Sequence, residues 1–142
     1  MQQHHLTRLE TQIDASPEAV WQVLTDPAIV WQYFFGSELV TTWEVGSTIV
    51  FRGEWEGQPY EDKGTVLAYT HNQSLAFSYL SNWSNLPDEP DNYLHITYTV
   101  EAVGGGTRLT ITQTNYDEAR AAHSLENWTS VVESMKNFLP VS

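Results

Sequence analysis

The chain has 142 residues, 41% of them hydrophobic, and this length and composition predict one folded domain, residues 1–142, with a single core. Six Lys and Arg residues against 18 Asp and Glu residues give a net charge of −12, which argues against nucleic acid and anionic membrane surfaces as partners. The sequence has no cysteine, which excludes disulfides and thiolate chemistry and favours a reducing, cytoplasmic location.

The first part of the chain predicts a strand followed by two short helices. Residues 3–14 alternate loosely between apolar and polar side chains, which is typical of a strand. In Ser16-Pro17-Glu18, an N-cap, a proline at the first helical position and an acidic side chain together start a helix. Asp26-Pro27 repeats this chemistry and starts a second short helix, which Gly36 ends.

After Ser47 the chain alternates with a period of two, which predicts antiparallel strands joined by short turns. The positions expected to point inward are Ile49, Phe51, Trp55, Leu75, Phe77, Tyr79, Leu94, Ile96, Tyr98, Leu109 and Ile111. Gly57 and residues 104–106 mark turns, and Gly64 marks a bulge or a point where two strands approach closely.

The last element is a long amphipathic helix, predicted near Glu118 to Leu139 with Asp117 as its N-cap. Its expected apolar stripe consists of Ala121, Leu125, Trp128, Val132, Met135 and Leu139. This helix is the only predicted element long enough to cover the apolar face of an antiparallel meander. The expected fold is therefore α+β, a curved antiparallel sheet wrapped around a long C-terminal helix, with two short helices after the first strand.

Two interpretations fit the many aromatic side chains. They either fill an ordinary core, or they wall a hollow, since rigid rings on a concave sheet opposite one helix do not interdigitate fully. On the second interpretation, the cavity walls are Trp31, Phe34, Phe35, Phe51, Trp55, Phe77, Tyr79, Tyr98, Trp128, Val132 and Met135.

Gln113 and Asn115 continue the inward face set by Leu109 and Ile111. A buried amide without a partner costs about 1–3 kcal/mol, so something must satisfy each of them. Backbone groups, a helix cap or water are one solution, and a ligand that one amide orients as a polar anchor is the other. The polar loop of residues 81–92, with Trp83 and Leu86, is either a lid over the cavity or a slack connection.

The titratable residues carry no catalytic or metal motif. The carboxylates around Gly57 are interpreted as a solvated acidic hairpin, and they are Glu54, Glu56, Glu61 and Asp62. His95 and His123 are expected to face solvent. No HExxH or GxSxG pattern occurs, so we predict no catalytic residue, no metal and no cofactor.

Eight short motifs, in this order and spacing, carry a resemblance to a known family. They are Ser16-Pro17-Glu18-Ala19-Val20-Trp21, Leu24-Thr25-Asp26-Pro27, Tyr33-Phe34-Phe35-Gly36, Trp43-Glu44-Val45-Gly46-Ser47, Gly53-Glu54-Trp55-Glu56-Gly57, Tyr60-Glu61-Asp62-Lys63-Gly64, Gly106-Thr107-Arg108-Leu109-Thr110 and Asn127-Trp128. From about Leu9 to Leu139 the chain resembles the SRPBCC, or START-like helix-grip, superfamily. The branch is the one named after the C-terminal domain of the activator of the ninety-kilodalton heat-shock-protein ATPase.

The resemblance implies a deep apolar cavity between the sheet and the long helix, which holds lipids, sterols, polyketides and other hydrophobic molecules across the superfamily. The favoured hypothesis is a non-catalytic binder of a small hydrophobic molecule of the lipid, polyketide or aromatic metabolite class. The alternatives are a cyclase- or hydrolase-like enzyme, which needs a titratable side chain inside the cavity, and a chaperone-regulating or other interaction module.

The expected partners follow from this hypothesis and from the charge. We expect a small hydrophobic ligand, no nucleic acid and no membrane, with the chain as a monomer or homodimer. The co-chaperone has an additional N-terminal domain that this sequence does not resemble, so the chain lends no support to a chaperone contact.

Overall fold

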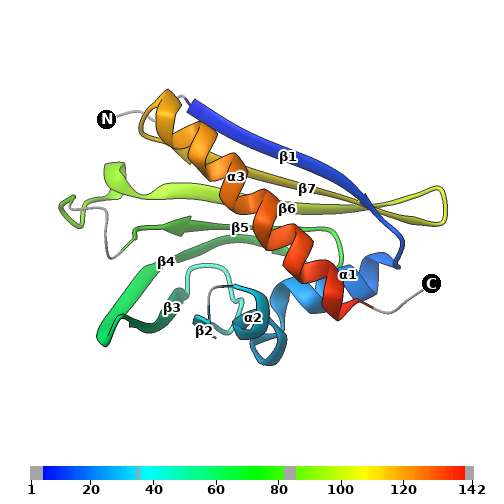
Figure 1. Ribbon diagram of the computed structural model, residues 1–142, viewed down its shortest axis with the longest axis horizontal. Coiled ribbons are helices and arrows are strands. Elements are labelled where there is room, and N and C mark those ends of the chain that lie inside the picture. Colours follow the sequence, from blue (N-terminus) through cyan, green and yellow to red (C-terminus); the bar gives the residue numbers. More distant parts are fainter. Residues whose placement is uncertain (1–4, 35, 82–85, 140–142) are drawn as a thin grey trace.

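The computed structural model describes residues 5–34, 36–81 and 86–139, and within these ranges one antiparallel sheet curves around a long helix (Figure 1). The strands are β1 (His5–Ile13), β2 (Glu38–Val40), β3 (Thr48–Trp55), β4 (Gln58–Thr70), β5 (Ser74–Tyr79), β6 (Leu94–Val103) and β7 (Gly106–Asn115). Their order, β1-β7-β6-β5-β4-β3-β2, is a meander from β2 to β7 with β1 added beside β7. The predicted α+β fold is confirmed.

The two short helices begin where the capping residues predict. Helix α1 (Pro17–Thr25) is capped by Ser16, whose hydroxyl accepts a hydrogen bond from the backbone N–H of Ala19. Helix α2 (Pro27–Tyr33) is capped in the same way by the Asp26 carboxylate. Each cap satisfies a backbone N–H group that has no partner within its helix, so these local contacts determine where the helices begin.

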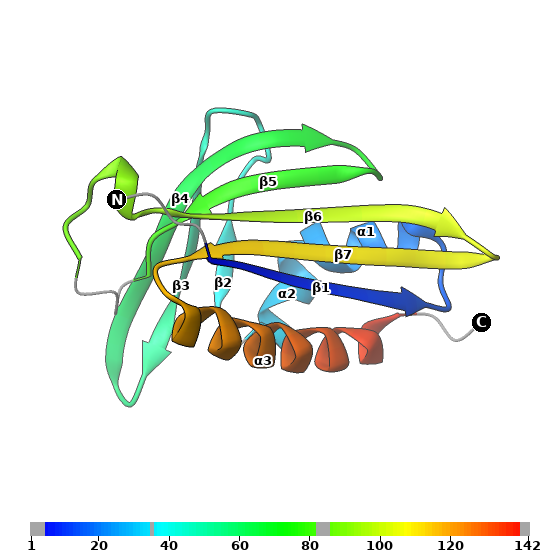
Figure 2. The same ribbon diagram turned by 90° about the horizontal axis from the view of Figure 1, so that it is seen from above.

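Helix α3 (Glu118–Met135) runs along the concave face of the sheet, and a 3-10 turn follows it at Lys136–Phe138 (Figure 2). The helix thus ends earlier than the predicted Leu139. Trp128, Val132 and Met135 are buried as expected, whereas Leu125 is 41% exposed. The face of α3 that is buried against the sheet includes Ser124 and Val131 and does not include Leu125. The prediction of Leu125 as part of the buried stripe is therefore wrong. The rotation of α3 about its axis depends on packing, which periodicity alone does not specify.

Gly64 lies where β4 and β5 approach each other closely. A Cβ atom added there would lie 1.6 Å from the backbone carbonyl oxygen of Ser78, which confirms the predicted close approach. Nearby, the register between β4 and β5 shifts between Val66 and Ala68. Such irregularities bend a strand, and β4 curves strongly in Figure 2.

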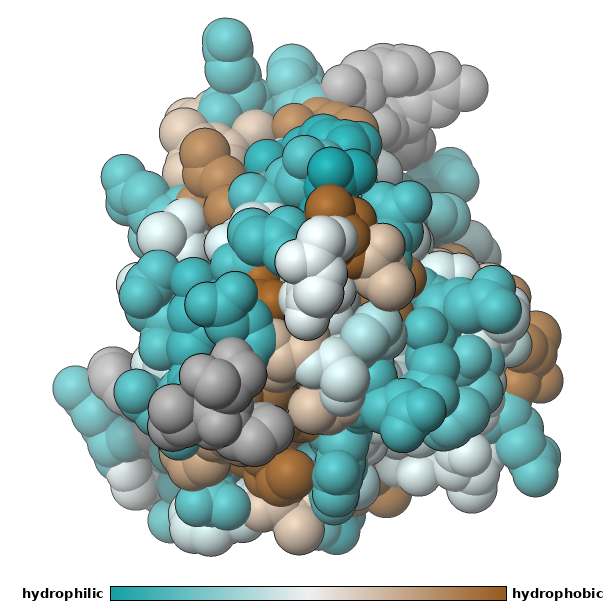
Figure 3. All heavy atoms as spheres, turned by 90° about the vertical axis from the view of Figure 1, so that its right-hand side faces the viewer, coloured by the Kyte–Doolittle hydropathy of each residue, from teal (hydrophilic) through white to brown (hydrophobic). Residues whose placement is uncertain are grey.

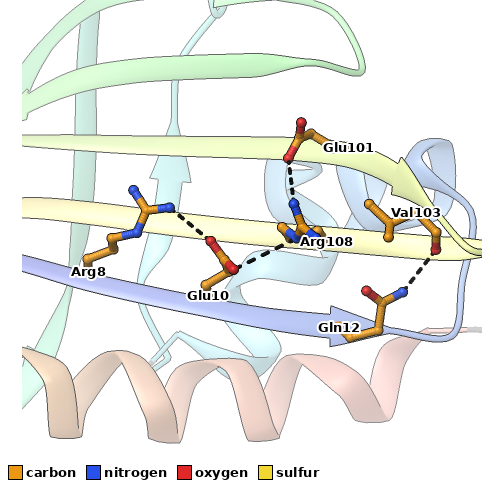
Figure 4. Close-up of polar contacts among 6 residues, drawn as sticks. All are labelled: Arg8, Glu10, Gln12, Glu101, Val103 and Arg108. Carbon is orange, nitrogen blue, oxygen red and sulfur yellow. Dashed lines mark hydrogen bonds and ion pairs between the residues drawn. The ribbon is translucent and has the colours of Figure 1, made fainter.

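The convex face of β1, β7 and β6 carries a network of exposed charges (Figure 4). Glu10 accepts a hydrogen bond of 2.8 Å from Arg8 and lies 3.8 Å from Arg108, which in turn lies 3.6 Å from Glu101. Exposed pairs of this kind contribute about 0–1 kcal/mol each, so they keep this face polar and add little stability.

The side of the molecule at which α1 and the β6–β7 turn lie is mostly hydrophilic, with scattered hydrophobic residues (Figure 3). In the described part of the chain, none of the helices combines the length and apolar character needed to span a bilayer.

Candidate functional site

A pocket of about 850 Å³ lies between the N-terminal half of α3 and the concave face of the sheet. Its lining comes from the residues that follow α2, from β3 to β7 and from α3, so elements far apart in the chain build it together. The apolar part of the lining consists of Phe34, Phe51, Phe77, Leu94, Ile96, Trp128 and Val131. Pockets of about 300–1,000 Å³ with mostly apolar walls and a few polar groups are typical of small-molecule sites.

Aromatic rings form a continuous series from α2 across the sheet to α3. Phe34 stacks on Phe51 with ring centroids 5.2 Å apart, and Phe51 lies 5.9 Å from Phe77. Tyr98 joins the series edge-on, 5.8 Å from Phe77 and 5.7 Å from Trp128. Because each ring packs against the next by stacked, tilted or edge-to-face contacts, the rings form one continuous aromatic wall.

Asp62 is a buried carboxylate in the pocket lining, with only 6% of its surface exposed. The Tyr79 hydroxyl donates to Asp62 Oδ2 at 2.5 Å. Burial, and then the neighbouring carboxylate, raise the pKa of Tyr79 well above its ordinary value of 10, so Tyr79 stays a protonated donor. The sequence prediction placed Asp62 on a solvated hairpin, and this is wrong. Counting back by twos from buried Val66 would have shown that Asp62 points inward.

Two hydroxyl groups form a further pair in the same lining, and one of them comes from the residue two positions before Asp62 on β4. Tyr60 and Ser37 are both buried, and their hydroxyl oxygens are 2.5 Å apart. Ser37 follows α2, and Tyr60 points inward from β4 for the same reason as Asp62. The sequence analysis missed this pair, because the turn after α2 has no periodicity that would place Ser37.

Gln113 and Asn115 find their hydrogen-bond partners within the protein. Gln113 Oε1 accepts from the Trp128 indole at 2.9 Å, and Gln113 Nε2 donates to Asn115 Oδ1 at 3.0 Å. Asn115 Nδ2 contacts the His5 carbonyl at 2.9 Å and Thr7 Oγ1 at 3.0 Å. Both amides line the pocket, yet their bonds tie β1, β7 and α3 together. Of the two solutions predicted for these amides, the structure therefore contains the one supplied by the protein's own groups.

Ser124 places a buried hydroxyl in the lining of the pocket, on the side of α3 that faces the sheet. The residue is 6% exposed, and among the described residues its Oγ is the one buried side-chain nitrogen or oxygen without a hydrogen-bond partner. The sequence carries no signal for this role, because a serine in an amphipathic helix is ordinarily assigned to the solvated face.

The polar end of the lining also includes Arg120 and the exposed His123 on α3. The Arg120 guanidinium is already engaged, since it donates to Asp117 Oδ2 at 2.6 Å and lies 5.5 Å above the ring centre of Tyr116. Arg120 is the only Lys or Arg among the described residues that line the pocket.

The structure brings together only part of the predicted site. Lining the pocket are Phe34, Phe51, Phe77, Tyr79, Trp128, Gln113 and Asn115. Tyr98 is buried behind Phe77 and Trp128, and Val132 and Met135 belong to the solid core farther along α3. Phe35 and Trp83 lie outside the described residues, as does the Trp55 side chain.

Two predicted site residues lie away from the pocket. Trp31 is 54% exposed, because α2 buries Val30 and Tyr33 and so turns Trp31 outward. The prediction of Trp31 as a cavity wall is therefore wrong. Leu86, one of the two residues of the predicted lid, is 38% exposed and is not part of the lining.

A seven-stranded curved antiparallel sheet with a long C-terminal helix along its concave face defines the helix-grip class of α+β proteins. Residues 14–140 match the family described as Activator of Hsp90 ATPase homolog 1-like protein, and the chain belongs to this family. The resemblance inferred from the sequence motifs is thereby confirmed.

Solved structures with the same fold cover nearly the whole chain. ChR145 from Cytophaga hutchinsonii is 38% identical, with a TM-score of 0.84 over 97% of this chain and 95% of that chain. MLL2253 from Mesorhizobium loti is 22% identical, with a TM-score of 0.74 over 94% of this chain and 95% of that one. The Aha1 dimer from Colwellia psychrerythraea is 22% identical, with a TM-score of 0.73 and 96% of both chains covered. A comparison with curated proteins finds no match.

Proposed function

We propose that the protein binds a small hydrophobic molecule in the pocket between α3 and the sheet. The observation that carries this proposal is the lining itself, in which seven apolar side chains border a space of about 850 Å³. Burying an apolar molecule there gains about 25 cal/mol for each Å² of apolar surface removed from water.

A cyclase- or hydrolase-like reaction in the same pocket is the second candidate, because Asp62 supplies the buried titratable group that such an enzyme needs. The two candidates differ in what happens to the ligand. A binder releases the molecule with its mass unchanged after prolonged incubation, whereas an enzyme releases a product of different mass.

Pyrene is a suitable first probe, because it is apolar and its emission spectrum reports the polarity of its surroundings. We expect wild-type protein to bind pyrene, and the variant Leu94→Trp to bind it at least tenfold more weakly. Leu94 is buried in the lining, and an indole at this position fills space that the probe needs. Fluorescence titration measures both affinities.

The matched control is Arg108→Ala on the convex face, which should leave pyrene affinity unchanged within twofold. Circular dichroism verifies that all variants fold. Pyrene affinities that are equal in Leu94→Trp and wild type would place the binding site elsewhere and refute the proposal.

A further inference from the structure

We propose that β1 pairs edge to edge with the β1 of a second copy of this chain, antiparallel and with Leu9 at the two-fold axis. The two curved sheets then form one continuous sheet, in which Arg8 of each copy lies opposite Glu10 of the other. This inference goes beyond the proposed function, because it concerns the outer edge of the sheet and not the pocket.

The outer edge of β1 is long, regular and open. All nine residues of β1 pair with β7 in one unbroken register. Among the residues that the structure describes, none pairs with the other side of β1, which borders the sheet in Figure 2. The strand at the opposite border, β2, has only three residues. Proteins protect edges by short strands, prolines and bulges, and β1 has none of these, so its outer N–H and C=O groups are open to another strand.

The charges of β1 select one register for this pairing. Arg8 and Glu10 are exposed on the convex face, and Leu9 between them is half-buried on the concave face. A second β1 that keeps its convex face on the same side can shift only in steps of two residues. The register centred on Leu9 places Arg8 opposite Glu10 twice. The neighbouring registers, centred on Arg8 or on Glu10, place two like charges directly opposite each other, which is destabilising.

The charge around this edge is balanced, although the whole chain carries −12. Two of its six cationic side chains, Arg8 and Arg108, lie on the convex face beside Glu10 and Glu101. Two copies of an acidic chain repel each other wherever their negative charges face. The edge of β1 is therefore a place where two copies can approach without that repulsion.

An exposed apolar side chain on α3 flanks the same edge. Thr7 Oγ1 donates to the Ala121 carbonyl, so this side of α3 adjoins β1. Leu125 lies one helical turn after Ala121 on that side and is 41% exposed. Since α3 and β1 run in the same direction (Figure 1), Leu125 lies about level with Leu9. A two-fold axis at Leu9 brings the Leu125 side chains of both copies toward each other, which removes apolar surface from water.

Sedimentation equilibrium of the wild-type chain in about 0.15 M salt tests the pairing. One strand edge and one helix flank make a small interface, so we expect a dimer dissociation constant of about 10–100 µM. Arg8→Glu places two carboxylates opposite each other, and Glu10→Arg places two guanidinium groups opposite each other. Each variant should weaken the dimer by about tenfold or more.

Exchanging the two charges tests the register. The double variant Arg8→Glu/Glu10→Arg keeps opposite charges across an axis at Leu9, so its dissociation constant should lie within about threefold of the wild-type value. Registers centred on position 8 or 10 give no such rescue, because like charges stay opposite each other. An equimolar mixture of the two single variants should also associate, since each cation then faces an anion of the other chain.

Arg52→Glu is the matched control for Arg8→Glu, because it changes the net charge by the same amount. Arg52 is exposed on β3, and four strands separate it from β1. Charges that far apart are screened by salt, so the dissociation constant should stay within about twofold of the wild-type value. Leu125→Glu should weaken the dimer by about tenfold or more, since it buries a charge in place of an apolar side chain. Circular dichroism verifies that all variants fold.

The remaining outcomes count against the proposal. A wild-type chain that stays monomeric up to about 1 mM would overturn it, as would a dimer that Arg8→Glu leaves unchanged. Equal weakening by Arg8→Glu and Arg52→Glu would show that net charge alone governs association. A double variant that fails to dimerise would refute the register at Leu9, and an unchanged dimer in Leu125→Glu would refute the contact through α3. The pyrene titration decides the proposed function separately.

Discussion

Replacing Gly64 with alanine is expected to lower the free energy of unfolding by about 3 kcal/mol or more, the largest effect that we predict for this chain. The added Cβ atom would lie 1.6 Å from the backbone carbonyl oxygen of Ser78. Because this oxygen belongs to the neighbouring strand and not to a mobile side chain, β4 and β5 must separate and lose hydrogen bonds. Urea unfolding followed by circular dichroism measures the loss.

Gly53→Ala is the matched control, since it makes the same substitution on the adjoining strand β3. There the nearest atom to the added Cβ is the hydroxyl oxygen of Tyr60, at 2.9 Å. The end of a side chain can shift by a few tenths of an ångström, so this variant should lose less than half as much stability. Wild-type stability in Gly64→Ala would contradict the close approach of the strands on which the curvature of the sheet depends.

Asn115→Leu is expected to cost about 3 kcal/mol, although leucine preserves the volume of the side chain. Asn115 is 2% exposed, and its amide bonds to the His5 carbonyl, to Thr7 Oγ1 and to Gln113. Leucine leaves these buried polar groups without their partner. Each orphaned group costs about 1–3 kcal/mol, which is why the expected loss exceeds the value of one hydrogen bond.

Hydrogen exchange locates this second effect. Thr7 Oγ1 donates to the Ala121 carbonyl at 2.8 Å, so Asn115 connects β1 to the first turns of α3 through Thr7. Amide protection should therefore fall at the start of β1 and in the first turns of α3. Thr112→Val on the convex side of β7 serves as the control and should change stability by less than about 0.5 kcal/mol. If Asn115→Leu also changed the free energy of unfolding by less than about 0.5 kcal/mol, the proposed role of Asn115 in connecting β1 to α3 would be contradicted.

Much of the fold is predictable because its signals are local. The Ser16 and Asp26 caps predict where α1 and α2 begin, and alternation predicts the strands from β3 to β7. Strand β2 (Glu38–Val40) goes unpredicted, since three residues are too short to show a period. The end of α3 is misplaced because no glycine or proline stands between Met135 and Leu139, and the last turn tightens into a 3-10 turn.

The candidate site is less predictable, and Asp62 and Ser124 show why. Asp62 belongs to an acidic stretch that we interpreted as a solvated hairpin, although the alternation along β4 places it on the same inward face as Tyr60 and Val66. Ser124 is polar and lies in an amphipathic helix, and only the packing of α3 against the sheet buries it. In contrast, Phe51 and Phe77 lie on the alternating apolar face and are correctly predicted to be inward.

The sequence by itself determined the class of fold and the order of its elements, because caps, strand alternation and helix periodicity act between residues close together in the chain. Only the tertiary structure decided where the pocket lies and which polar groups face it. Those features depend on strand register and on the rotation of α3 against the sheet, and both are set by contacts between residues far apart in the sequence.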